Sequence, residues 1–183
     1  MKKTVLTFGL IAGVMISVLM DASLLLAHRI GSGHSMLLGY TIMVASFLLV
    51  YFGIRSYRDN VLAGRISFGR AFACGILITL ITTVCYVATW EVLYFKFMPH
   101  FMDSYFAAQI LRAQSSAPDP ATAAARVAAI RHSQQLYQNP IVNIAYTFIE
   151  PLPVGLLITL VSATILRRKA PVESAAAPAL KAT

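Results

Sequence analysis

Three acidic residues, Asp21, Glu91 and Glu150, interrupt long apolar stretches of this sequence. A charged carboxylate is costly inside a membrane, so such residues face the protein interior, pair with another group or bind a proton. We therefore take these three as candidate intramembrane functional acids. For Glu150, a neutral carboxyl in a structural hydrogen-bond network is favoured over a proton or cation site.

Glu150 precedes two prolines within the apolar stretch "TFIEPLPVGLL". Pro151 and Pro153 have no N–H, so they leave the carbonyls of Thr147 and Ile149 without their helical partners. We expect the helix to break here, and the freed carbonyls need partners or must face a cavity. A protonated Glu150 would donate to one of them, whereas an ionised Glu150 would favour a cation.

The neighbours of the other two acids suggest how each is placed. Gly9 and Gly13 form a G-x-x-x-G pair and Ser17 extends this small face, so the first helix is expected to pack closely and direct Asp21 inward. Around Glu91, the stretch "YVATWEVLYF" carries two tyrosines and a tryptophan. We favour an aromatic belt at the membrane interface over an aromatic cage for a cation.

No other pattern in the sequence indicates catalysis or a cofactor. With Asp21, Glu91 and Asp103, the histidines could build a metal site, but no ligand pair has helical i, i+4 or H-x-x-H spacing, and we expect no metal. The four histidines are His28, His34, His100 and His132. Phosphate loops, Ser/His/Asp sets and cofactor fingerprints are not found. Cys74 and Cys85 lie about 16 Å apart on one helix, too far for a disulfide.

The elements that must position these acids are membrane helices. Of 183 residues, 58% are hydrophobic and 12% are charged, and the mean hydropathy is +0.71, which is typical of an integral membrane protein. The apolar runs long enough to span a bilayer are residues 4–27, 36–54, 71–97 and 141–166. We predict an all-α integral membrane four-helix bundle, whose first run is a retained helix rather than a cleaved signal peptide.

The basic residues predict the orientation of this bundle. If the chain crosses four times, three clusters fall on one side, so both termini are expected to be cytoplasmic, N-in/C-in. The clusters are Lys2 and Lys3; Arg55, Arg58, Arg65 and Arg70 in an inner basic loop; and Arg167, Arg168 and Lys169. This placement explains the net charge of +8 better than nucleic-acid binding, and the loop could also contact anionic lipid headgroups.

Residues 98–140, between the third and fourth runs, are expected to form an extracytoplasmic helical hairpin. Asp119 is a plausible N-cap with Pro120 at the first helical position, and Asn139-Pro140 ends the second helix. We expect the two helices to pack over the mouth of the bundle, with a mobile tether as the alternative. Residues 1–169 form a single membrane domain, followed by a disordered cytoplasmic tail over residues 170–183.

Three segments, "FGIRSYRDN", "GRISFGRAFACGI" and "EPLPVGLLITLVSATIL", resemble a bacterial family catalogued as domain of unknown function 4199. The resemblance covers nearly all of the chain before the tail. It implies a small, multi-spanning bacterial membrane protein, and it supplies no activity or catalytic residues.

We favour a non-enzymatic accessory or scaffold protein in the cell envelope, multi-pass in the bacterial cytoplasmic (inner) membrane. The alternatives are a small oligomeric proton- or cation-coupled carrier, and a membrane enzyme with an outward-facing site. Expected partners are the lipid bilayer and another membrane protein or further copies of this chain. A carrier needs a water-accessible path to Glu150, whereas a scaffold should be packed there.

Overall fold

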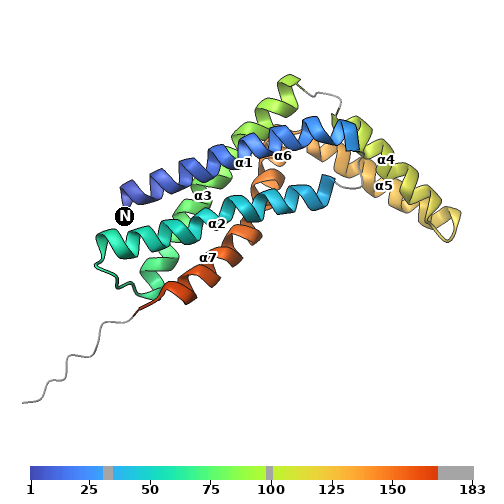
Figure 1. Cartoon of the computed structure of the whole chain (residues 1–183). Helices are drawn as coiled ribbons and strands as arrows, with labels where there is room; N and C mark the ends of the chain where they lie inside the picture. The colour runs from blue at the N-terminus through green and yellow to red at the C-terminus, as the bar shows by residue number, and fades with distance from the viewer. Residues whose placement is uncertain (31–34, 98–100, 169–183) are drawn as a thin grey trace, which may run out of the picture.

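The structure is a computed structural model, and it describes residues 1–30, 35–97 and 101–168. The described chain is helical nearly throughout, with one isolated β-bridge between Ile66 and Arg168 (Figure 1). The helices are α1 (Lys2–Ile30), α2 (Ser35–Val61), α3 (Phe68–Val92), the π-helical turn η1 (Leu93–Phe97), α4 (Phe101–Ser115), α5 (Pro120–Tyr137), α6 (Pro140–Ile149) and α7 (Leu152–Leu166).

Within the described residues, four helical segments are long and apolar enough to cross a membrane. They are Lys2–Leu24, Leu37–Val61, Phe68–Phe97 and Pro140–Leu166. Each overlaps one of the apolar runs, so the prediction of an all-helical protein with four helices that could span a membrane is confirmed. Their mutual packing fits a membrane helical bundle.

The link between the second and third spans is shorter than the sequence suggested. Arg55 and Arg58 lie on α2 and Arg70 on α3, so Arg65 alone of the four predicted loop arginines lies in the link. The helix persists past the end of the apolar run because Arg and Tyr are acceptable helix formers. In addition, Asp59 pairs with Arg55 across one turn at 3.6 Å.

A left-handed turn ends α2. Ala63 has φ of 48° and Gly64 has φ of 80°, a conformation that L-residues other than glycine rarely adopt. The Gly64 N–H donates to the carbonyl of Arg58 at 2.9 Å, which closes the helix end. Gly69, five residues further on, lies inside α3.

α1 and α3 run parallel and touch along small residues. Ser17 Oγ and Thr89 Oγ1 share a hydrogen bond of 2.7 Å across an offset of 72 residues. Gly9 lies against Ile81 and Gly13 lies against Cys85, again 72 positions apart in sequence. A Cβ on Gly13 would lie 2.6 Å from Cys85 Sγ, so only glycine fits. The small face of the first helix therefore packs as its sequence predicts.

α3 and α7 run antiparallel in an equally close contact. A Cβ on Gly75 would lie 2.7 Å from Thr159 Cγ2, and one on Gly155 would collide with Thr79. Thr79 and Thr159 share a hydrogen bond of 3.1 Å. Below the proline break, the fourth span thus lies directly on the third, while Phe47 of α2 fills the space beside Gly155.

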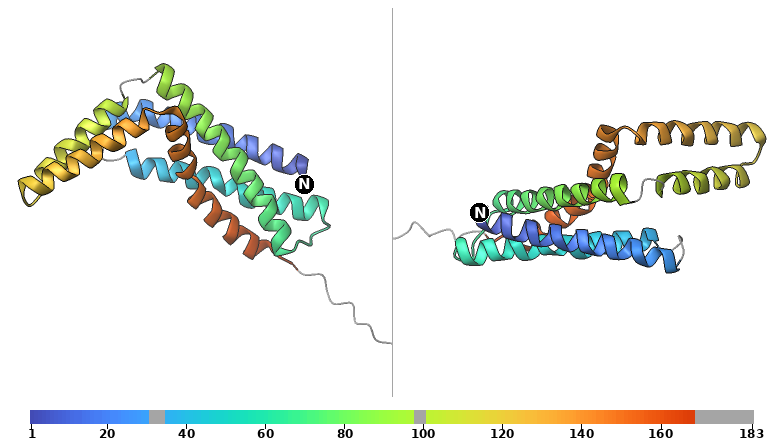
Figure 2. Two further views of the ribbon diagram at one scale, coloured as in Figure 1. Left: turned by 180° about the vertical axis from the view of Figure 1, so that it is seen from behind. Right: turned by 90° about the horizontal axis from the view of Figure 1, so that it is seen from above.

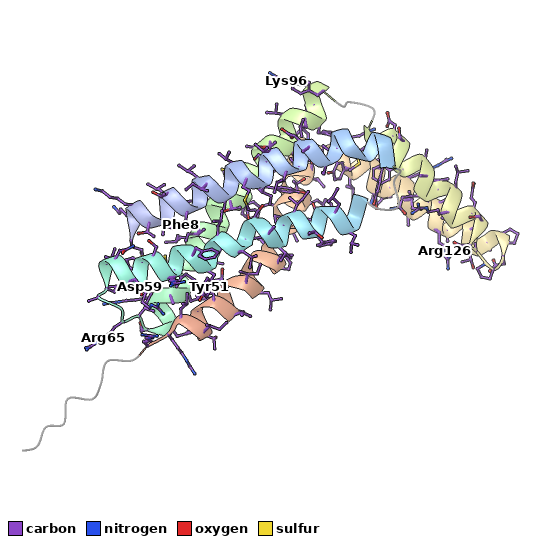
Figure 3. All side chains as sticks on the ribbon, in the orientation of Figure 1. Phe8, Tyr51, Asp59, Arg65, Lys96 and Arg126 are labelled. Carbon is purple, nitrogen blue, oxygen red and sulfur yellow. The ribbon has the colours of Figure 1, made fainter. Side chains whose placement is uncertain are left out.

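The N-terminus, the α2–α3 link and the end of α7 lie at one end of the spans (Figure 1). The Arg168 N–H donates to the carbonyl of Ile66 at 2.9 Å, which joins the link to the end of α7. Figure 3 shows Arg65 at this end, whereas Lys96 lies far from it. The three basic clusters predicted to share one side therefore share one end of the molecule, insofar as their residues are described.

α4 and α5 form an antiparallel hairpin that begins at the opposite end of the spans. It projects away from them, so the expected packing over the bundle mouth is wrong (Figure 2). Asp119 caps α5 by accepting from the Thr122 N–H at 2.8 Å. α5 ends at Tyr137, just before Asn139-Pro140, and Asn139 also caps α6. α5 packs mainly against α4, and none of its residues is completely buried.

Candidate functional site

The fourth span breaks at Glu150. α6 ends at Ile149, Glu150 occupies its C-cap, and α7 begins at Leu152 after Pro151. The Gly155 N–H resumes the helical ladder by donating to the carbonyl of Pro151 at 3.0 Å. The break also changes the neighbours of the span, because α6 packs mainly on α3 and α5 whereas α7 packs on α2 and α3.

The break places Glu150 against the third span. The Tyr86 hydroxyl donates to Glu150 Oε2 at 3.1 Å, and Tyr86 is only 8% exposed. Glu150 itself is exposed. Among the described residues no Lys, Arg or His forms an ion pair with it. The carboxyl therefore has a hydrogen-bond partner and no counter-charge.

Two polar side chains precede Glu150 on the inner face of α6. Asn143 is fully buried and Thr147 is 4% exposed. The Thr147 hydroxyl donates to Asn143 Oδ1 at 3.2 Å, but the Asn143 Nδ2 amino group has no partner among the described residues. On α3, the buried Oγ1 of Thr83 also lacks a partner in the described chain, and this residue lies between the Tyr86–Glu150 and Thr79–Thr159 contacts.

Aromatic residues join this face to the base of the hairpin. The Trp90 indole N–H donates to the Tyr137 hydroxyl at 3.2 Å, and Tyr94 packs edge-on against the Tyr137 ring at 5.8 Å. Burial raises the pKa of the Tyr137 phenol, while hydrogen bonds to Thr147 and Trp90 oppose that shift. Tyr94 is 9% exposed, so Tyr86 and Tyr94 face the interior and the expected interfacial belt is wrong for both.

The other two candidate acids lie apart from Glu150. Asp21 on α1 and Glu91 on α3 are each partly buried, and each keeps one buried carboxylate oxygen, Oδ1 and Oε1 respectively, without a partner in the described chain. The described residues contain no group of three or more His, Cys, Asp or Glu side chains that could hold a metal ion. The acids are therefore separate features rather than one centre.

Of the four histidines, His132 lies exposed on α5. The positions or side chains of His28, His34 and His100 lie outside what the structure describes, as does the predicted tail over residues 170–183.

The sequence-based prediction missed Asn143, Thr147 and Thr83, although the spacing of polar residues in the third and fourth spans could have indicated them. Asn143, Thr147 and Glu150 follow one another at i, i+4 and i+7, which places them on one helical face. Thr79, Thr83 and Tyr86 repeat that spacing in the third span. Two polar stripes in apolar helices predict a shared polar seam.

The comparisons with known proteins identify a family but no characterised relative. None of the curated proteins and none of the solved structures compared with the chain matches it. The family model described as "Protein of unknown function (DUF4199)" matches residues 7–168. Since this match covers most of the chain, from within the first span to just past the fourth, the chain belongs to the DUF4199 family.

Proposed function

We propose that this protein is a non-enzymatic accessory or scaffold protein of the bacterial inner membrane, whose α4–α5 hairpin receives a partner protein. The observation that carries the proposal is the hairpin. α5 is an 18-residue helix with no buried residue, and it projects beyond the spans (Figure 2). A helix in this position has much surface available to another protein.

The basic end of the spans supports a cytoplasmic location for both termini. Arginines near membrane helices remain on the cytoplasmic side. Arg65, Arg70, Arg167 and Arg168 are all exposed at that end. The hairpin then lies on the extracytoplasmic side. The same arginines would bind anionic lipid headgroups, at about 1 kcal/mol for each residue near the surface.

The spans support an anchor better than a carrier. Below Glu150, the contacts of Gly75 and Gly155 with the threonines of the facing helix leave no room for even a Cβ atom. Interiors packed in this way shift between discrete arrangements rather than deforming continuously. A transport path along this interface would therefore have to separate α3 from α7. Proton or cation flux in reconstituted vesicles that depends on Glu150 would favour the carrier instead.

The hairpin proposal can be tested by photo-crosslinking in cells. A photoreactive amino acid at Ala128, on the exposed face of α5, should yield a discrete protein adduct identified by mass spectrometry. The matched control is Leu157, which is 63% exposed on a membrane span and should yield lipid adducts. Adducts of Ala128 with lipid alone, or only with water, would contradict a partner on the hairpin.

A further inference from the structure

A row of polar groups leads from the hairpin base to Glu150. Asn143, Thr147 and Glu150 lie on one face of α6, and the first and last are about 10 Å apart along the helix axis. Tyr137 at the end of α5 interacts with Thr147, so the row begins where the hairpin meets the spans. Its other end is the break, beyond which α3 and α7 are in close contact.

The row contains hydrogen-bonding capacity that the described protein does not use. Asn143 is 0% exposed and its Nδ2 donates to none of the described groups. Leaving a buried polar group unpaired costs about 1–3 kcal/mol. Buried groups of this kind are commonly paired with ordered water. Water fits here because it accepts from an amide and donates to a carboxylate.

The described groups around Glu150 provide no positive charge. On α3 the facing titratable group is Tyr86, and the phenols of Tyr40 on α2 and Tyr137 on α5 lie near it. α7 carries no titratable residue, and on α6 Tyr146 is 58% exposed. A carboxylate in apolar surroundings without a cation is most simply neutralised by a proton.

We propose that Glu150 reversibly binds a proton that reaches it from the hairpin end through water held by Asn143. Proton binding converts a carboxylate that accepts from Tyr86 into a carboxylic acid that also donates. The freed carbonyls at the break are the nearest acceptors for that proton along the chain. Below the site, α7 lies directly on α3. This inference does not depend on a partner for the hairpin.

Infrared difference spectroscopy of the full-length protein in lipid bilayers tests the proposal. The C=O stretch of a protonated carboxylic acid should be present at acid pH and should disappear reversibly as the pH is raised. The Glu150→Gln variant should lose this band, whereas the control Glu91→Gln should keep it. In Glu150→Asp, which retains the carboxyl, the band should shift in frequency rather than vanish.

Two outcomes overturn proton binding at Glu150. A Glu150 band that persists at every pH identifies a permanently neutral structural residue, and the lack of any such band identifies a permanently ionised one. The water route has a separate readout in the exchange of the acid proton for deuterium. Exchange should be slowed in Asn143→Leu, which removes the buried amide, and an unchanged rate would refute the route while leaving proton binding intact.

Discussion

At the scale of single residues, the defining contact is the one between Tyr86 and Glu150. It joins a nearly buried phenol to a carboxyl at a helix break, two groups separated by 64 residues in sequence. Each would be unfavourable alone in apolar surroundings, because an unpaired polar group there loses its hydrogen bonds to water. Together they explain how the fourth span tolerates both an acid and two prolines.

The Tyr86 contact leads to a prediction for two substitutions of Glu150. Glu150→Gln keeps an acceptor for the Tyr86 hydroxyl, so expression and thermal stability should be close to wild type. Glu150→Leu leaves that hydroxyl without a partner and should lower the free energy of unfolding by about 1–3 kcal/mol. Thermal unfolding in detergent measures both. Equal losses in the two variants would indicate an ionised, paired glutamate instead.

Asp119 should make the start of α5 sensitive to acid. Its carboxylate accepts from the Thr122 side chain and N–H, and these hydrogen bonds hold the pKa of Asp119 below its usual range. A lowered folded-state pKa stabilises the helix above the unfolded-state pKa, and that stabilisation is lost as the pH falls through the folded-state pKa.

Amide-exchange protection of the first turn of α5 measures this effect. Protection should fall on acidification of the wild type. Asp119→Asn should retain much of the cap and lose the pH dependence, since asparagine is also a favourable N-cap. Parallel acid dependence in the two proteins would show that another group is responsible.

At the scale of helices, glycine positions decide which spans approach closely. Gly13 lies against Cys85, whereas Gly39 has no atom within 4 Å of where its Cβ would be. The two residues are similar in sequence context, since both lie in apolar helices. Only the three-dimensional contact makes one of them essential to packing.

This difference predicts unequal effects of alanine. Gly13→Ala should force α1 and α3 apart and destabilise the protein by about 1–3 kcal/mol, the usual range for overpacking. Gly39→Ala should be neutral or slightly stabilising, because alanine favours helix. Thermal unfolding of the two variants side by side provides the measurement. A loss at Gly39 as large as that at Gly13 would contradict the packing described here.

At the scale of the whole molecule, the spans form the membrane anchor and the hairpin extends beyond one end. Figure 3 shows Arg126 toward the hairpin tip and Arg65 at the other end of the molecule. The proposed orientation follows from the larger number of basic residues at the Arg65 end. It therefore predicts that the two ends face different compartments.

Cysteine labelling tests the proposed topology. In a background lacking Cys74 and Cys85, cysteines at Ser116 in the hairpin and at Asn60 near the α2–α3 link should be labelled from opposite sides of the membrane. A membrane-impermeant thiol reagent applied to intact cells should reach position 116 only. Labelling of both positions from outside would rule out the four-span arrangement with cytoplasmic termini.

The sequence by itself determined the features that arise from local chemistry. The four spans follow from runs of apolar residues, the break at Glu150 follows from prolines that lack an N–H, and the α5 cap follows from Asp119 before Pro120. Each depends on residues within a few positions of one another, so the pattern of residue types is sufficient to find it.

Only the tertiary structure decided which distant groups meet. The partner of Glu150 and the burial of Asn143 depend on the register between α3 and the fourth span, and contacts such as Gly155 with Thr79 set that register. The direction in which the hairpin projects likewise depends on which face of α5 packs against α4. Hydropathy and helical periodicity determine where a helix begins and which face is apolar, but the pairing of two faces is determined by the fit of side chains across the interface.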